Sequence, residues 1–281
     1  MAEYTYRLVN VFAHDSTLSG NPLCVFEDGR GLTDADMLAL ALQFNLSETT
    51  FVLPSARADA GVRIFTPNGE LPFAGHPTLG TAAVVRELKR TGDRLALDMQ
   101  AGVIPVERAG DSFTLQANAP KWRAPEAARQ DLARMLGLDA GDIGEAPLWI
   151  NTGMEQLLVP LASEDAVRRA VPVPELAKRW ANHSGMVKIY VWFERHDGSF
   201  ATRFFFEKQP GVIMEDSGTG SACANLGGWL IATQRALPVR RTVHQGDHLG
   251  RACRLGLSVD ADRIIRVSGR VLDIGRGTIT L

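Results

Sequence analysis

The sequence predicts an α+β fold made of two similar halves, and three observations lead to this prediction. Strand-like segments follow one another directly, as in antiparallel hairpins, and no regular strand–helix–strand array is present. Two segments that lie 140 residues apart have the pattern of the same strand–loop–helix unit. The length of 281 residues suits two domains. We therefore expect one domain at 1–118 and another at 119–281, with the C-terminal strand able to cross back to the first.

The repeated unit carries different polar residues at its two loops. An addition of 140 to the residue number sets His76 of the first copy opposite Asp216 of the second. A duplicated scaffold with a histidine in one copy and an aspartate in the other predicts one cleft shared by the two halves. The same addition makes five further matches without a gap: Arg63 with Arg203, Phe65 with Phe205, Gly80 with Gly220, Thr81 with Ser221, and Ala82 with Ala222.

The elements follow from hydrophobic periodicity and from capping residues. Thr33 can cap a helix over 33–44, and Pro77 occupies a favoured first-turn position of a helix over 77–89. Gly137 ends a helix over 126–136, and small residues allow close packing of a helix that runs from Ser217 or Thr219 to 234. Two further helices are expected at 164–170 and 175–182, and the linker is expected at 119–125. Strands are expected at 5–12, 22–26, 48–53, 61–66, 95–99, 103–107, 113–117, 147–151, 156–159, 187–194 and 202–206, with short strands after 234.

Composition excludes several classes of function. Hydrophobic residues make up 45% of the chain, enough for two cores, and the net charge of -2 comes from interspersed acids and bases. The sequence has no basic patch of the kind that binds nucleic acid, and it has no apolar run long enough to span a membrane. The N-terminus lacks the features of a signal peptide, and the three cysteines lack metal-site or disulfide spacing. We expect a reduced, cytoplasmic protein without a nucleotide cofactor, since the chain has neither a dinucleotide-binding glycine motif nor a P-loop.

Two loops have the composition of anion sites. Gly75 and His76 stand at the entrance of the helix over 77–89, where backbone N–H groups attract an anion, although a histidine there can also serve only the loop. The second loop, at the start of another helix, holds an acid, two glycines and three hydroxyl residues, more than one helix cap requires. Its residues are Asp216, Ser217, Gly218, Thr219, Gly220 and Ser221.

Glu48 precedes an apolar strand, and locally it has the pattern of a solvated strand-edge residue. His244 and His248 have a spacing that suits a metal on a helix. Gly246 between them indicates a turn, and no third ligand is near, so we expect no metal site.

The chain resembles the PhzF family of phenazine-biosynthesis isomerase-like proteins, which share the diaminopimelate epimerase fold. The resemblance covers essentially the whole chain. It rests on four motifs in family order: Thr17-Leu-Ser-Gly-Asn-Pro22, Asn45-Leu-Ser-Glu-Thr-Thr-Phe-Val52, Phe65-Thr-Pro with Glu70 to Ala82, and Glu215-Asp-Ser-Gly-Thr-Gly-Ser-Ala222.

The resemblance implies two pseudo-symmetric epimerase-like domains, each a curved mixed sheet around a central helix, and a homodimer. It implies that Glu48 is the acid/base, and that His76 and Asp216 hold the substrate and balance charge. Backbone N–H groups of Gly75, His76, Thr219 and Gly220 would bind a carboxylate, beside Ser217 and Ser221. The implied reaction is a cofactor-free proton shift on a small cyclic carboxylate, as in trans-2,3-dihydro-3-hydroxyanthranilate isomerisation.

Two departures from the family pattern and two alternatives remain. The segment Glu207–Gly211 replaces a tighter turn, and Asn225 stands where small residues are typical. One alternative is an amino-acid racemase or epimerase of the same fold, which needs two facing thiols, whereas the loops hold Ala74 and Ser217 near those positions. The other alternative is a two-lobed protein that binds a small carboxylate without turnover.

Overall fold

The computed structural model describes residues 1–281, and the chain divides into two compact units. Unit 1 comprises Met1–Gln116 together with Ser268–Leu281, and unit 2 comprises Ala117–Val267. The ranges expected from the sequence were 1–118 and 119–281, with a returning C-terminal strand. None of the helices is both long and apolar enough to cross a lipid bilayer.

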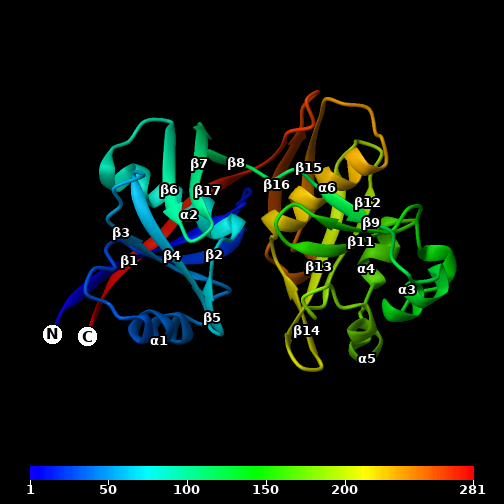
Figure 1. Ribbon diagram of the computed structural model, residues 1–281, viewed down its shortest axis with the longest axis horizontal. Coiled ribbons are helices and arrows are strands. Elements are labelled where there is room, and N and C mark those ends of the chain that lie inside the picture. The colour runs from blue at the N-terminus through cyan, green and yellow to red at the C-terminus, as the bar shows by residue number, and fades with distance from the viewer. The chain divides into compact units, whose positions relative to one another are not determined.

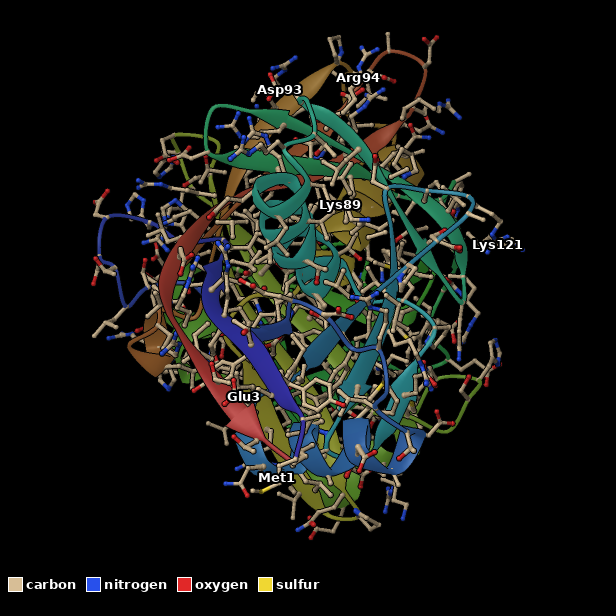
Figure 2. All side chains as sticks on the ribbon, turned by 90° about the vertical axis from the view of Figure 1, so that its left-hand side faces the viewer. Met1, Glu3, Lys89, Asp93, Arg94 and Lys121 are labelled. Atoms are coloured by element: carbon tan, nitrogen blue, oxygen red, sulfur yellow. The ribbon has the colours of Figure 1, made fainter.

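Unit 1 is a mixed sheet packed around one helix, α2 (Figure 1). Its strands pair mostly antiparallel, but β2 pairs parallel to β3, and β4 pairs parallel to β6. Strand β17 runs antiparallel to β1, and Figure 2 shows the two side by side near Glu3. The elements are β1 (Glu3–Val11), β2 (Asn21–Phe26), α1 (Asp34–Phe44), β3 (Thr49–Leu53), β4 (Ala60–Thr66), β5 (Gly69–Leu71), α2 (Gly75–Lys89), β6 (Arg94–Met99), β7 (Gly102–Ala109), β8 (Ser112–Gln116) and β17 (Ile265–Thr280).

Helix α2 is the centre of unit 1, and it contacts β1, β2, β3, β4, β6 and β8. Gly80 allows this close approach. A Cβ atom at Gly80 would lie 2.6 Å from Cδ2 of Leu23 and 2.9 Å from Cγ2 of Val11, so any other residue would force these side chains or the helix to move. The smaller helix α1 covers β3 and β4, and Thr33 caps it as predicted, with Asp36 completing a reciprocal capping box.

Unit 2 repeats this arrangement around helix α6, which packs on β9, β10, β11 and β16. Three short helices, α3, α4 and α5, form a second core with the outer face of β11, β12 and β13. The elements are β9 (Lys121–Arg123), α3 (Arg129–Met135), η1 (Ala140–Asp142), β10 (Leu148–Asn151), β11 (Glu155–Pro160), α4 (Glu164–Arg169), α5 (Pro174–Ala177), η2 (Lys178–Trp180), β12 (Lys188–Glu194), β13 (Phe200–Gln209), β14 (Val212–Asp216), α6 (Gly220–Ala232), β15 (Val239–Gln245), η3 (Asp247–Leu249) and β16 (Cys253–Val259).

Three expected features differ from the structure. The segment 119–125, expected as the linker, lies within unit 2 and contains strand β9, which pairs with β10. The helix expected at 175–182 is a single α-turn, α5, which tightens into the 3-10 helix η2. The end of the chain is not a set of short strands, because β17 is 16 residues long. Its first five residues alternate between buried and partly buried, and the remaining residues are all partly or fully exposed. Hydrophobic periodicity therefore marks only part of the strand.

The gapless repeat is wrong at the loops. The strands before the loops do keep the shift of 140 residues. Phe51 pairs with Arg63 in unit 1, and Val191 and Arg203, each 140 residues later, pair with each other in unit 2. The hairpins then differ in length. Phe65 pairs with Glu70 in the first hairpin, and Phe205 pairs with Glu215 in the second, so five extra residues enter there, where β13 also carries a bulge between Glu207 and Gln209. Departure from the family pattern at 207–211 coincides with this longer hairpin.

The five extra residues change which loop positions correspond. Helix α2 starts at Gly75 and helix α6 starts at Gly220, a shift of 145. The structural counterpart of His76 is therefore Ser221, not Asp216, and the counterpart of Asp216 is Leu71.

Each unit keeps one arginine–glutamate pair beside this hairpin. Arg203 donates to both carboxylate oxygens of Glu215, at 3.2 and 2.8 Å, and its remaining nitrogen donates to three backbone carbonyls at the end of α4. Arg63 pairs with Glu70 in the same way, at 2.8 and 2.6 Å. Only 8% of the Arg203 side chain is exposed, against 26% for Arg63, so the pair in unit 2 is the more deeply buried.

Replacement of Arg203 by Met should lower the free energy of unfolding of unit 2 by about 3–5 kcal/mol, because Glu215 is left as a buried charge without its partner. Urea unfolding followed by tryptophan fluorescence measures this, since all five tryptophans lie in unit 2. Arg63→Met in unit 1 is the control, and it should leave the tryptophan-detected transition in place. A change below about 1 kcal/mol, the range of exposed pairs, would contradict the expectation.

Candidate active site

In unit 1, a glutamate and a histidine from different elements lie together. Helix α1 ends at Asn45, whose left-handed backbone (φ 49°) turns the chain so that Glu48 directly precedes β3. His76 lies in the first turn of α2. Nδ1 of His76 is 3.5 Å from Oε2 of Glu48, and the side chains are 7% and 16% exposed. A hydrogen bond of 2.8 Å between the hydroxyls of Thr50 and Thr81 joins β3 to α2 beside them.

The Glu48–His76 pair has the composition of a proton-transfer site. A carboxylate and an imidazole are the side chains most used for general acid–base chemistry, and burial makes their interaction stronger than in water. The first turn of α2 adds positive potential from its N–H groups. The N-cap residue is Ala74, so no side chain of the cap occupies those groups.

In unit 2, the predicted loop joins β14 to α6. Asp216 is the last residue of β14, and Oδ2 of Asp216 accepts a hydrogen bond of 2.5 Å from the Thr219 hydroxyl. Thr219 is the N-cap residue of α6, but its side chain does not cap the helix. The simple capping role weighed from the sequence therefore does not apply to Thr219. Its hydroxyl instead serves Asp216.

The remaining predicted residues of this loop differ in environment. Ser217 is buried, and Gly220 opens α6. The hydroxyl of Ser221 accepts a hydrogen bond of 2.9 Å from Gln156, whose side-chain oxygen in turn accepts one from Asn225. Asn225, noted in the sequence as a departure from the family pattern, is fully buried and also bonds Thr152. Ser221 and Asn225 thus belong to a network that ties α6 to β11.

Gln245 is a residue that the sequence interpretation passed over. It ends β15, is fully buried, and hydrogen-bonds both Asp216 and Thr219. The sequence had singled out its neighbours His244 and His248 as a metal pair to be discounted. The signal available in the sequence was an amide side chain, Gln245, at the end of a strand and directly before a glycine.

His244 and His248 line an open pocket of about 730 Å³ on unit 2, together with Glu164, Arg195 and Arg254. Burial and the nearby Arg254 and Arg195 lower the pKa of His244. The guanidinium groups are engaged, since Arg195 pairs with Glu164 and Arg254 pairs with Asp247. No group of three or more His, Cys, Asp or Glu side chains in the structure is arranged to hold a metal ion.

The three cysteines are all buried and unbridged: Cys24 in β2, Cys223 in α6 and Cys253 in β16. Burial raises the pKa of each thiol. A thiol must ionise to act as a base or nucleophile, so these three positions suit packing rather than catalysis.

The native protein should react very slowly with an aromatic disulfide reagent, because the attacking species is an exposed thiolate and these thiols are neither exposed nor easily ionised. Thiol titration at pH 8 measures the rate, and the same titration in concentrated urea should release all three thiols as a control. Two thiols that react rapidly in the native state would overturn this view and favour a two-thiol mechanism.

Known proteins resemble the chain along its whole length. The profile of the family described as phenazine biosynthesis-like protein (PhzC-PhzF) matches residues 9–278. An uncharacterized isomerase of Pasteurella multocida is 39% identical, over 99% of this chain and 95% of the relative. The trans-2,3-dihydro-3-hydroxyanthranilate isomerase of Pseudomonas fluorescens is 33% identical, over 99% and 100%. A crystal structure of a PhzF-family protein from Bacillus anthracis superposes with a TM-score of 0.88, at 23% identity and full coverage of both chains.

The chain therefore belongs to the phenazine biosynthesis-like, or PhzF, family, as the sequence motifs indicated. It is an isomerase, the class to which the named relatives belong. The solved structure shares its fold.

Proposed function

We propose that the chain is a cofactor-independent isomerase that shifts a proton on a small cyclic amino or hydroxy carboxylate. The observation that carries the proposal is the buried Glu48–His76 pair, with 3.5 Å between Oε2 and Nδ1. Relatives of the chain, among them the Pseudomonas fluorescens enzyme, are named for isomerisation of trans-2,3-dihydro-3-hydroxyanthranilate. Chemistry of that kind needs one group that removes a proton from carbon and returns it to another carbon.

In the proposed reaction, the Glu48 carboxylate takes the proton of a substrate C–H bond, and the electron pair of that bond moves into the conjugated system. The same proton then returns from Glu48 to a different carbon, so no oxidant or other reactant is required. His76 supports both steps. Its imidazole beside Glu48 holds the carboxyl group in position and, when protonated, offsets the charge of the carboxylate before the transfer.

Substrate binding is proposed at the two helix starts. Gly75 and His76 open α2 and Gly220 opens α6, so both helix starts present N–H groups suited to a carboxylate. The N–H of Thr219, which was also expected to bind the carboxylate, instead donates to Oε1 of Gln245 at 3.3 Å. Asp216, beside Ser217 and Ser221, would take a cationic or hydroxyl group of the substrate. The shared cleft stays a prediction. The family resemblance supports it, whereas the repeat does not, because His76 and Asp216 are not at corresponding positions of the two units.

The alternatives lack a supporting observation of equal weight. A two-thiol racemase needs ionisable facing cysteines, whereas Cys24, Cys223 and Cys253 are buried with raised pKa values. A binding protein without turnover would have no use for a buried carboxyl group beside an imidazole, which costs stability. The homodimer and the identity of the substrate stay predictions.

Replacement of Glu48 by Gln should reduce turnover by about 10²–10⁴-fold, since the amide keeps the shape but cannot carry the proton. The protein is incubated with dihydro-hydroxyanthranilate or related cyclic amino acids in D₂O, and deuterium incorporation is followed by mass spectrometry. Glu126→Gln, at an exposed position, is the control and should exchange at the wild-type rate. Exchange by Glu48→Gln at the wild-type rate would mean that Glu48 is not the base.

Dialysis of the active protein against a chelator should leave its turnover unchanged, because no step of the proposed reaction passes through a metal ion. The measurement compares the rate before dialysis, after dialysis, and after addition of Mg²⁺, Mn²⁺ or Zn²⁺. Loss of the rate with recovery on addition of one metal would count decisively against the proposal.

A further inference from the structure

The side chain of Gln245 is fully buried although it carries a primary amide. Nε2 donates to the backbone oxygen of Asp216 at 2.9 Å and to the hydroxyl of Thr219 at 2.9 Å. Oε1 accepts a hydrogen bond of 3.3 Å from the backbone N–H of Thr219. Both donor hydrogens and the acceptor are thus used, and every one of these bonds goes to the same loop.

These bonds determine the direction of the next hydrogen bond. The backbone oxygen of Asp216 can only accept and the backbone N–H of Thr219 can only donate, so the amide orientation of Gln245 follows from its surroundings. Because Nε2 donates to the Thr219 hydroxyl, the single hydrogen of that hydroxyl is free to point to Oδ2 of Asp216, 2.5 Å away. The chain of donors from Gln245 through Thr219 therefore ends on Asp216, whose Oδ2 is the acceptor.

The backbone beside Gln245 is also in contact with this loop. Gly246 has a left-handed backbone (φ 77°), and a Cβ atom there would lie 2.5 Å from the backbone oxygen of Ser217 and 2.3 Å from that of Arg251. Any other residue would therefore displace the loop that carries Asp216. The turn at Gly246 therefore supports the loop that carries Asp216 and also connects β15 to η3.

The duplication shows that the fold does not require an amide at this position. Ala60 pairs with Leu97 in unit 1, and Phe200 pairs with Val243 in unit 2. Two residues beyond those partners lie Met99 and Gln245, each the last residue of its strand. Met99 is buried, and its sulfur is 3.6 Å from the Thr78 hydroxyl. The same structural place accepts an apolar side chain in the unit whose corresponding loop carries no aspartate.

We infer that Gln245 is a positioning residue, which holds Thr219 and Asp216 in the arrangement that the proposed isomerase uses. This inference rests on the proposed function for its catalytic consequence. It assigns Gln245 no contact with the substrate. Its effect on the carboxylate of Asp216 passes through the Thr219 hydroxyl, while its bond to the backbone oxygen of Asp216 holds the loop.

The test replaces Gln245 by Met, the residue that unit 1 carries at the same place, and replaces Thr219 by Val, which keeps the shape without the hydroxyl. Each change should reduce kcat by about 10- to 100-fold, the cost of a small displacement of a site group. If Gln245 acts through Thr219, the double variant should be no slower than the slower single variant. Met99→Leu is the matched control and should keep the wild-type rate.

Losses that multiply in the double variant would overturn the relay, because they would mean two independent effects. A rate for Gln245→Met that falls only in proportion to the unfolded fraction, measured by tryptophan fluorescence, would likewise overturn it in favour of a structural role. Amide hydrogen exchange of residues 216–221 separates this inference from the proposed function. Those amides should exchange faster in Gln245→Met than in wild type, whether or not any tested carboxylate is turned over. Unchanged exchange would refute the support of the loop.

Discussion

The close packing of one central helix against the sheet is the constraint on which unit 1 depends. Gly80 lets α2 approach β1 and β2 more closely than a Cβ atom would allow without movement of Leu23 and Val11. This contact determines the position of the whole helix, including its first turn. His76 consequently stands beside the start of β3, where Glu48 is held by the turn at Asn45. The pair of side chains is thus a consequence of helix packing.

The duplicated scaffold allows different chemistry in its two copies, because the pairing of the strands is kept while the loops and some strand side chains differ. The second hairpin is five residues longer, and the last residues of β6 and β15 are Met99 and Gln245. The arginine–glutamate pairs beside the hairpins are retained in both units. The loops can change while the ion pairs stay, because the arginines lie on the strands β4 and β13 and not in the loops.

Strong local signals made part of the fold predictable from sequence. Thr33 marked the start of α1, and the glycines and small residues of α6 marked a closely packed helix. The weaker expectations failed where tertiary contacts override local pattern. The segment 175–182 shortens to one α-turn and a 3-10 turn, and β17 extends far beyond the stretch that alternates. The 140-residue repeat misled at the loops, because sequence identity alone cannot locate an insertion within a hairpin.

The sequence by itself determined the family, the class of enzyme and the short segments that carry polar residues at helix starts, because these depend on local motifs. Only the tertiary structure decided which of those residues meet. It brought Glu48 to His76 across 28 residues, directed the Thr219 hydroxyl to Asp216, and added Gln245 from a distant strand. The physical reason is that strand register and helix packing set these distances, and neither is encoded in the residues of a single segment.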